Sequence, residues 1–491
     1  MKPSLIDQTQ RDRFVRETGH NFSVVAPAGV GKTTAIVDRI VRIAESNSPS
    51  NPVVPRLVMV TYTRKAAQEM LLRARNEMVK NDKISASTMA QLHQAYFGTI
   101  HSYCLNLVQR FALRMGLPPK LEIMQNEEEL WADFIRSRDV LVSEFPEILG
   151  NRILQLIPIE KLLELAKKVP PKSYSEEQLV KPLPNLDIQP ILDIPDAYKN
   201  GKVINTVRRW HKASIKWVQD LEQGKYAPLP SILSNSKIAG GKKMEAAVDT
   251  AFGEIRKWLG ETSLIYAQAI AKEYRKYKLQ QGVVSYDDII HLAVQVVRTP
   301  EYIAELRKEK PIILLDEAQD TDKQQFEVLL ELARPINAGG QWLFDGGDVP
   351  EQGRFSMVGD PQQAIYGSRA DVKVYEGIRK RLCENNGTEH LSLAVTMRCD
   401  RRIVHAMNSL MPDVLDNRNG QVAYVNMEPS PWAKEGQVLY VNLELPDEEI
   451  DDEAYTKAFA QWLNTQSLET LRASSWEQVA ILCPRKAWLQ S

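Results

Sequence analysis

The stretch Ala26-Pro-Ala-Gly-Val-Gly-Lys-Thr-Thr34 decides the fold of this chain. It follows a short apolar run, Phe22 to Val25, that predicts a buried strand, and it precedes apolar residues at helical spacing from Ala35 to Val41. A strand, a loop ending in Gly-Lys-Thr and a helix form the phosphate-binding P-loop arrangement. Ala26 stands where the general pattern has its first glycine, so a glycine-rich turn with a chance lysine is the alternative.

Each residue type in this loop has a chemical reason. Gly29 and Gly31 let the backbone amides turn toward an anion with no Cβ in the way, and the start of the next helix adds the positive end of its dipole. Lys32 can reach the β- and γ-phosphates, and the Thr33 hydroxyl can hold Mg²⁺. The residues expected to bind the nucleotide phosphates are Ala28, Gly29, Val30, Gly31, Lys32, Thr33 and Thr34.

Composition indicates an ordinary globular protein with more than one domain. The 491 residues are 43% hydrophobic and 25% charged, with a formal net charge of −1, so any nucleic-acid surface has to be local. The four cysteines lack metal or disulfide spacing, which favours a reducing cytoplasm. Residues 1–10 are polar and no apolar run can cross a bilayer, so we expect neither a signal peptide nor a membrane partner.

The order of elements predicts an α/β protein with a helical insertion. Arg56 to Thr61 is a second strand candidate and runs into a helix from Lys65 to Lys80, and Gly98 to Cys104 is another strand-to-helix step. Alternating strands and helices predict a parallel sheet. The chain then reads as mostly helical from Leu105 to Gln281, and the α/β pattern resumes at Val283.

The second half of the helical segment interleaves basic residues with tryptophans, as at Arg208-Arg209-Trp210, Lys216-Trp217 and Arg256-Lys257-Trp258. One interpretation is a surface that tracks phosphates and stacks bases. The other is a solvated helix face with the tryptophans packed inward, because long Lys and Arg stems commonly cover apolar surface.

The run Pro311-Ile-Ile-Leu-Leu-Asp316-Glu317 predicts an apolar strand that ends in two carboxylates. Ligands bind at the carboxyl edge of a parallel sheet, so we expect both acids at the edge that carries the P-loop. Asp316 would hold Mg²⁺ through water, and Glu317 would orient or deprotonate the attacking water. The alternative is a solvated strand end.

Gly339-Gly340 and Gly346-Gly347 flank a predicted hairpin or loop excursion. Further strands are predicted at Phe355–Asp360, Leu391–Thr396, Val438–Leu443 and Val479–Leu482, with a helix near Glu453–Thr465.

Six motifs in a fixed order resemble those of UvrD/Rep-like superfamily 1 DNA helicases, which include the RecB and AddA helicase-nucleases. They are Gln10, Thr61-Tyr-Thr-Arg-Lys-Ala-Ala-Gln-Glu-Met70, Gly98-Thr-Ile-His-Ser-Tyr-Cys104, Asp316-Glu-Ala-Gln-Asp-Thr321, Val358-Gly-Asp-Pro-Gln-Gln-Ala-Ile-Tyr-Gly367 and Thr396-Met-Arg398. The resemblance implies a RecA-like P-loop NTPase sheet domain at residues 1–104 and 282–388. It also implies a helical insertion at 105–281 and a partial second RecA-like α/β domain at 389–491.

The resemblance also implies roles at matching positions. Gln10 would read the adenine edge, and Met397 stands where the family packs an aromatic on adenine. Gln363 and Arg398 would contact the γ-phosphate, so the catalytic set is Lys32, Glu317, Gln363 and Arg398. Thr61, Tyr62, His101 and Arg369 fall in segments that contact single-stranded DNA, with Tyr62 stacking on a base. Each of these residues also has a purely structural interpretation. His101 could be a structural histidine, Tyr62 could pack under a helix, and Gln363 and Arg398 could be polar residues on the surface.

Three features depart from the family pattern. Ser368 replaces an aromatic that stacks on DNA, and Met397 replaces the adenine-packing aromatic. The chain ends at Ser491, shortly after Val479 to Arg485, which resembles an early part of the second domain. The family continues with further motifs, so a shortened form, a split gene or a natural remnant is expected, and we expect a partner to supply the missing helicase part or a nuclease.

The function expected from the resemblance is an ATP-dependent DNA helicase or translocase that moves 3′ to 5′, with ATP and Mg²⁺ as cofactors. Its partner would be single-stranded DNA or DNA with a single-stranded tail. One rival is a DNA-binding ATP switch without unwinding. The other is an inactive structural partner, against which Lys32, Asp316, Glu317 and Gln363 argue because all four are present.

Overall fold

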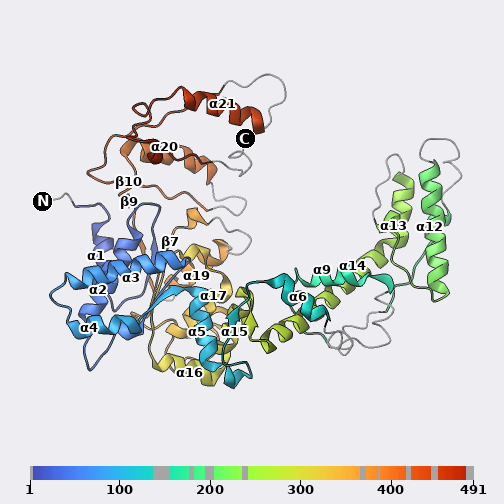
Figure 1. Cartoon of the computed structure of the whole chain (residues 1–491), viewed down its shortest axis with the longest axis horizontal. Helices are drawn as coiled ribbons and strands as arrows, with labels where there is room; N and C mark the ends of the chain where they lie inside the picture. The colour runs from blue at the N-terminus through green and yellow to red at the C-terminus, as the bar shows by residue number, and fades with distance from the viewer. Residues whose placement is uncertain are drawn as a thin grey trace.

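The computed structural model describes residues 4–136, 155–175, 182–193, 204–234, 242–364, 372–384, 387–415, 422–443 and 452–482. Figure 1 shows an α/β body from which a long helical arm projects, with the C-terminal helices α20 (Arg401–Val414) and α21 (Asp452–Asn464) lying on the opposite side of the body from α16 (Pro300–Lys308). None of the described helices is both long and apolar enough to cross a membrane.

A six-stranded sheet forms the centre of the body. All of its pairings are parallel, in the order β3-β2-β6-β7-β1-β8. Every residue of β1, β2, β6 and β7 is buried, as expected for a parallel sheet covered on both faces. The predicted α/β class is therefore confirmed. The strands are β1 (Phe22–Val25), β2 (Leu57–Thr61), β3 (Tyr96–Thr99), β6 (Ile312–Leu315), β7 (Phe355–Gly359) and β8 (Glu389–Ser392).

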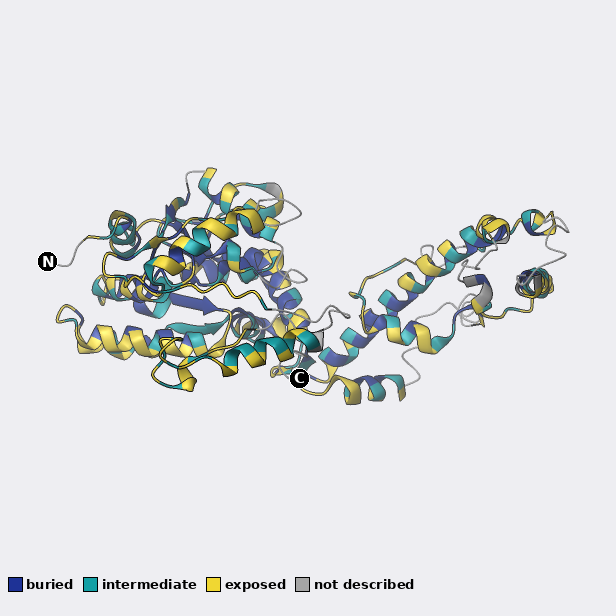
Figure 2. Cartoon of the chain, turned by 90° about the horizontal axis from the view of Figure 1, so that it is seen from above, coloured by how far each residue is buried: buried dark blue, intermediate teal, exposed yellow. Residues whose placement is uncertain are grey.

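Two apolar cores lie on the two faces of this sheet. Alternate residues of β2 enter different cores: Leu57 and Met59 pack with α1, α2 and α3, whereas Val58 and Val60 pack with α5, α15, α17 and α19. Figure 2 shows the buried strands between helices whose outer faces are exposed. The helices of the body are α1 (Gln8–Arg16), α2 (Lys32–Glu45), α3 (Arg64–Val79), α4 (Ala86–Ala90), α5 (Ile100–Phe111), α15 (Tyr286–Arg298), α16 (Pro300–Lys308), α17 (Lys323–Ala333), α18 (Trp342–Asp345) and α19 (Val372–Glu384).

Polar caps start several helices near the carboxyl edge of the sheet. The Thr63 side chain accepts a hydrogen bond from the first turn of α3, and Thr99 does the same for α5. Asp322 and Gln325 form a reciprocal capping box at the start of α17. Each of these caps follows a strand of the sheet, directly after β2 and β3 and after a short loop in the case of β6. The capping residues therefore bring polar side chains to one edge of the sheet.

The helical arm has its own apolar core. Trp210, Trp217 and Trp258 are all buried in it, and the Trp217 indole N–H donates to the Ala227 carbonyl at 3.0 Å. These rings are enclosed by protein, so the solvated-face interpretation describes the arm and base stacking on the tryptophans is excluded. The helices of the arm are α6 (Glu127–Arg136), α9 (Ile159–Ala166), α11 (Gln189–Leu192), α12 (Ile204–Glu222), α13 (Ser231–Ser234) and α14 (Lys242–Gln280).

Several elements lie at the predicted domain junctions. Helix α5 continues past residue 104 to Phe111 in the core of the body, and the two-residue strands β4 (Glu122–Ile123) and β5 (Val283–Val284) pair at the base of the arm. Strand β8 lies in the first sheet although it begins at residue 389, because it pairs with β1. The second small sheet pairs β9 (Val395–Thr396) with β10 (Glu428–Pro429).

Two predicted C-terminal strands are wrong. Residues 438–443 and 479–482 pair with no strand among the described residues, and several of their apolar side chains are exposed. A strand needs a neighbour for its backbone hydrogen bonds, and sequence pattern alone cannot supply one. The expected helix is present as α21 (Asp452–Asn464), after α20 (Arg401–Val414). The excursion between Gly339 and Gly347 contains the one-turn helix α18 and no hairpin.

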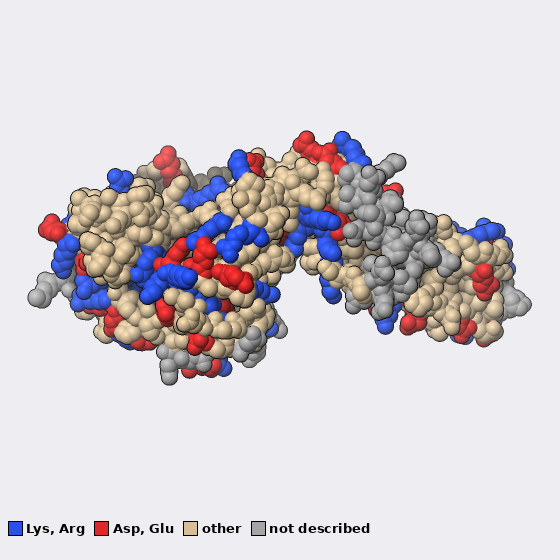
Figure 3. Space-filling view, turned by 90° about the horizontal axis from the view of Figure 1, so that it is seen from below, with Lys and Arg blue, Asp and Glu red and all other residues tan. Residues whose placement is uncertain are grey.

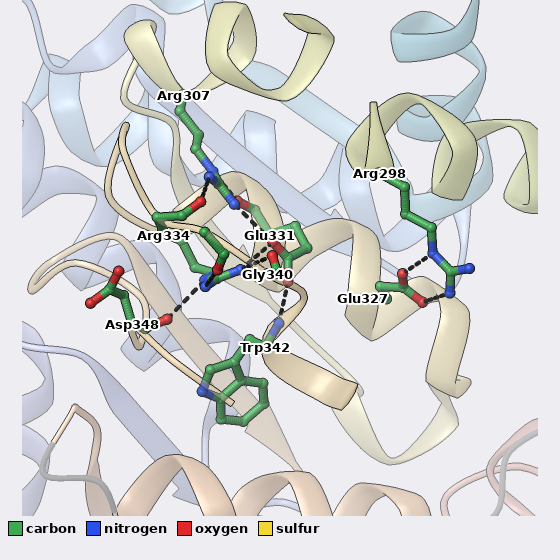
Figure 4. Close-up of polar contacts among 10 residues, drawn as sticks. Arg298, Arg307, Glu327, Glu331, Arg334, Gly340, Trp342 and Asp348 are labelled. Carbon is green, nitrogen blue, oxygen red and sulfur yellow. Dashed lines mark hydrogen bonds and ion pairs between the residues drawn. The ribbon is translucent and has the colours of Figure 1, made fainter. Parts of the chain in front are cut away.

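A buried ionic cluster holds this excursion against α17 (Figure 4). One oxygen of Glu331 accepts from Arg307 at 2.8 Å and from Arg334 at 2.7 Å, and the other accepts from the Trp342 backbone amide at 2.7 Å. Arg334 also donates to the carbonyls of Gly339, Gly340 and Asp348. The charged side chains of Arg307, Glu331 and Arg334 are all buried, so the stability of each charge depends on the other two residues.

Candidate nucleotide-binding site

The P-loop connects β1 to α2 through two glycines in the left-handed region. Gly29 has φ +76° and Gly31 has φ +85°, conformations that L-residues rarely adopt. A Cβ on Gly29 would lie 2.7 Å from both Arg398 Cβ and Thr396 Oγ1, so the loop also needs glycine for space. Helix α2 starts at Lys32 and directs the positive end of its dipole at the loop. Of the other expected phosphate contacts, Val30 is buried, Thr33 is half-buried, and Ala28 and Thr34 are exposed.

The two predicted carboxylates lie beside this loop. Asp316 follows directly on β6, and its amide donates to the Val60 carbonyl at 2.9 Å. The ammonium of Lys32 lies 3.1 Å from Glu317 Oε2, so the P-loop and the acidic strand end share one site. Glu317 adopts φ +53°, a left-handed conformation that costs a non-glycine residue about 1–3 kcal/mol and is concentrated at functional sites.

Burial controls the electrostatics of the acids. Desolvation raises the pKa of Asp316 to about 7, the charge of Glu317 adds to the rise, and Lys32 opposes it. Desolvation, with the Glu317 charge, also raises the pKa of Asp320 to about 6. Within the described residues, Oδ1 of Asp316 and Oδ1 of Asp320 are buried without a hydrogen-bond partner. Unsatisfied carboxylate oxygens are what Mg²⁺ requires, so the residues present fit this ion.

A cavity of about 330 Å³ opens at this edge of the sheet. Its lining combines the helix start after β1, the segment after β2 and the strand ends of β6 and β7. The chemistry-bearing residues that line it are Thr33, Thr61, Tyr62, Glu69, Asp316, Glu317, Gln319, Asp320 and Gln363.

Gln319 joins the ends of β6 and β7. Its amide donates to Glu317 at 2.9 Å and to Asp320 at 3.2 Å, and its carbonyl oxygen accepts from the Asp360 backbone amide at 2.9 Å. Asp360 in turn accepts from the side chain of Gln363, which lies in the short 3₁₀ turn Pro361–Gln363. The prediction omitted Gln319, although it stands inside the quoted Asp-Glu-Ala-Gln motif, which was the available signal.

The predicted residues from the C-terminal side meet the P-loop at its flank. The Met397 amide donates to the Gly29 carbonyl at 2.8 Å, and both Met397 and Arg398 are exposed. Gln10 is half-buried, and its side-chain oxygen accepts from the Ser392 amide at the end of β8. The structure therefore brings Gln10, Met397 and Arg398 to the same edge as Lys32.

The predicted DNA-contacting residues lie in different places. Thr61 is buried at the end of β2, and Tyr62 is 48% exposed at the rim of the cavity. His101 lies in the first turn of α5, after the edge strand β3, and its ring makes a T-shaped contact with the ring of Tyr286, with centroids 5.1 Å apart. It is not part of the cavity lining. Arg369 and Ser368 lie outside the described residues.

Comparison with known proteins places this chain in a family. The description UvrD/REP helicase N-terminal domain matches residues 7–382, which is most of the chain. The chain belongs to the UvrD/REP helicase family. This membership agrees with the motif order and with a Lys32–Glu317 contact at the edge of a parallel sheet.

Several proteins named as subunits of an ATP-dependent helicase/nuclease are similar to this UvrD/REP family chain. The one from Pediococcus pentosaceus is 23% identical, with 84% of this chain and 39% of the relative covered. The one from Exiguobacterium sibiricum is 22% identical, covering 84% and 40%, and the one from Lysinibacillus sphaericus is 23% identical, covering 97% and 46%. The chain thus spans about two fifths of the length of these curated relatives.

Proposed function

We propose that this chain is the ATP-hydrolysing motor portion of a DNA helicase or translocase that moves 3′ to 5′ along single-stranded DNA. The observation that carries the proposal is the 3.1 Å contact that joins Lys32 to Glu317, because Glu317 lines a cavity together with Asp316, Thr33 and Gln363. Two acids and a glutamine on one cavity, with a P-loop lysine in contact with one of the acids, meet the needs of phosphoryl transfer, in which positioning and electrostatics dominate.

Each side chain has a task in this proposal. The loop amides and Lys32 bind the phosphates, and Gln10 recognises the adenine. Thr33 and Asp316 hold Mg²⁺, which neutralises phosphate charge when bound. Glu317 orients the attacking water and takes its proton, while its left-handed backbone and the Gln319 amide fix its direction.

Two further residues complete the proposed transition-state contacts. Gln363, held by Asp360, approaches the γ-phosphate from the end of β7. Arg398, whose Cβ lies beside Gly29, adds a cation from the C-terminal side, where it can stabilise the charge that develops during phosphoryl transfer.

DNA would pass beside the same edge of the sheet. Tyr62 offers an exposed ring next to Thr61, and stacking on an aromatic face tolerates any base sequence, as a translocase requires. Acidic and basic side chains intermingle over the body in the view of Figure 3, so DNA binding would rest on local contacts rather than on a broad basic field. His101 and Arg369 are proposed as further contacts by resemblance.

The polarity and the partners rest on the family. Curated relatives are named helicase/nuclease subunits, and by analogy we propose that a nuclease or a helicase-completing polypeptide works with this chain in the cytoplasm. Whether the chain unwinds DNA or only switches state on it is decided by a strand-displacement assay run beside the ATPase assay. Turnover stimulated by DNA without unwinding would identify the switch.

The ATPase assay uses the full chain with Mg²⁺-ATP, with and without single-stranded DNA of mixed sequence. We expect Lys32→Ala to abolish turnover, and Glu317→Gln to retain ATP binding while turnover falls about 10²- to 10⁴-fold, the range for a lost general base. Lys80→Ala, in an exposed ion pair where α3 ends, is the matched control and should hydrolyse ATP like the parent. If either site variant keeps parental turnover, these role assignments are wrong.

A further inference from the structure

An ion pair that the proposed chemistry does not use lies directly behind the P-loop. Arg11 donates two hydrogen bonds to the Asp7 carboxylate, from Nε and from Nη2, each at 2.8 Å. The side chain of Asp7 is 3% exposed and that of Arg11 is 12% exposed, so both charges are largely removed from water. The planar fork of arginine fixes such a pair in a single geometry.

This pair grips the main chain that leaves the first sheet. Oδ2 of Asp7 accepts from the amides of Ala394 at 2.9 Å and Val395 at 3.0 Å, and Arg11 Nη2 donates to the Val395 carbonyl at 3.1 Å. Both polar groups of Val395 are thereby bound to side chains of α1 and its N-cap. This main chain comes directly after β8 and begins β9, three residues before Arg398.

The same arginine also holds the P-loop. Arg11 Nη1 donates to the Val30 carbonyl at 2.7 Å, and the neighbouring Gly29 carbonyl accepts from the Met397 amide. In a loop whose amides converge on an anion, the carbonyls point outward. The carbonyls of Val30 and Gly29 therefore connect this loop to Arg11 and to the segment bearing Met397.

These contacts connect the P-loop to the segment that carries Arg398 at two points. Arg11 binds one P-loop carbonyl and one carbonyl of β9, and Met397 binds the next P-loop carbonyl. Arg39 secures the base of this arrangement, because its guanidinium donates to the carbonyl of Phe14 in α1 and to that of His20 in the turn before β1, and so ties α1 and the following turn to α2. A shift of the P-loop therefore has a direct mechanical route to Arg398.

We propose that Arg11, held by Asp7, is a positioning residue that sets where Arg398 lies relative to the nucleotide and couples the P-loop to the C-terminal domain. The inference rests on the proposed ATP hydrolysis and deepens it. Arg11 itself contacts no phosphate in this scheme, so its loss acts on turnover through Arg398 and leaves the loop amides and Lys32 to bind ATP.

The test compares Arg11→Ala with the parent in Mg²⁺-ATP turnover and in equilibrium binding of ATP. We expect kcat to fall about 10²-fold, since misplacing a reacting group by 1 Å has an effect of that order, while the ATP Kd stays within about threefold because uniform binding is retained. Arg16→Ala is the matched control, since this side chain lies on the same helix and is 71% exposed. It should match the parent in both quantities.

A double-mutant cycle separates positioning from general structure. In the parent we expect Arg398→Ala to lower kcat by about 10³-fold, the lower end for an arginine acting on a transferring phosphoryl group. In the Arg11→Ala background the same change should lower kcat less than about tenfold, because coupled residues are not additive. A full, additive loss from Arg398→Ala in that background would overturn the proposal, as would a parental kcat in Arg11→Ala.

Two further measurements keep the outcomes distinct. If thermal unfolding shows that Arg11→Ala does not fold, Arg11→Lys replaces it, because an ammonium keeps the charge beside Asp7 but lacks the planar fork that holds Asp7 and both carbonyls in one geometry. In Arg11→Lys we expect kcat to fall and the effect of Arg398→Ala to shrink, as in Arg11→Ala. A parental kcat in Arg11→Lys would reject the coupling. If the parent itself does not hydrolyse ATP, the proposed function fails. If the parent hydrolyses ATP, Lys32→Ala abolishes this turnover and Arg11→Ala leaves it intact, only the coupling through Arg11 is rejected.

Discussion

Replacing Glu331 with glutamine removes the carboxylate charge from a site where two arginines meet in the protein interior (Figure 4). In the parent, Glu331 accepts from Arg307, from Arg334 and from the Trp342 amide, and none of the three charged side chains belongs to a residue more than 4% exposed. Glutamine has nearly the same shape but one neutral acceptor in place of two charged ones. Two guanidinium groups would then share the interior without the carboxylate that contacts them both.

The magnitude follows from this burial. Leaving buried charge uncompensated destabilises a protein by about 3–5 kcal/mol. At about 2–4 °C per kcal/mol for a body of 150–250 residues, the melting temperature should fall by roughly 6–20 °C. The carbonyls of Gly339 and Gly340 still accept from Arg334, so we expect a weakened body with the same fold rather than a different one.

Thermal unfolding followed by circular dichroism measures this shift, with urea unfolding as a second probe. Glu77→Gln is the matched control, because Glu77 pairs with Lys80 on an exposed stretch of α3, and it should change stability by less than about 1 kcal/mol. The ATPase of Glu331→Gln, assayed well below its melting temperature, should equal that of the parent since Glu331 does not line the cavity. A melting shift no larger than that of Glu77→Gln would refute the reasoning.

Asp288 provides a pH prediction: burial raises its pKa, but the Lys278 charge and the hydrogen bonds from Lys278 and Ser285 outweigh this and leave the pKa lowered. A carboxyl group whose pKa is lower in the folded state stabilises the folded protein at pH values above the unfolded pKa of about 3.9. The melting temperature of Asp288→Asn should therefore lie furthest below that of the parent near pH 7, and the difference should shrink as pH falls below about 4. A difference that grows in acid would contradict this. Tyr62→Ala should weaken single-stranded DNA binding by about 1–3 kcal/mol, the range for one stacked base, with Tyr62→Phe as the control that keeps the ring. Equal DNA affinity in Tyr62→Ala and parent would rule out stacking.

The sequence predicted the sheet because its strands are short, apolar and bounded by glycine or by acids. Phe22 to Val25 and Ile312 to Leu315 carry no polar residue except Ser23, and buried parallel strands require that composition. Lys32 and Glu317 could be placed together before any coordinates, because the carboxyl ends of parallel strands share an edge. The division into domains and the individual site roles remain predictions.

The errors have a different origin. Residues 438–443 and 479–482 have the composition of strands, yet a strand also depends on a neighbour that local sequence does not encode. The tryptophans of the arm show the reverse case: Trp210 and Trp258 stand beside basic residues in the sequence, but helical spacing places the rings inside and the cations outside. Adjacency in sequence was a poor guide to adjacency on the surface.

Arginines were the residues whose roles the sequence concealed most completely. Arg39 and Arg334 look like ordinary surface cations in the sequence, but both are buried, and both donate to backbone carbonyls at the ends of helices or loops. A guanidinium has five donors and satisfies several free carbonyls at once, so it is suited to points where chain segments without regular pairing meet. Such points depend on tertiary structure alone. Arg11 occupies a point of this kind at the P-loop, which is why motif matching found Gln10 and passed over the residue beside it.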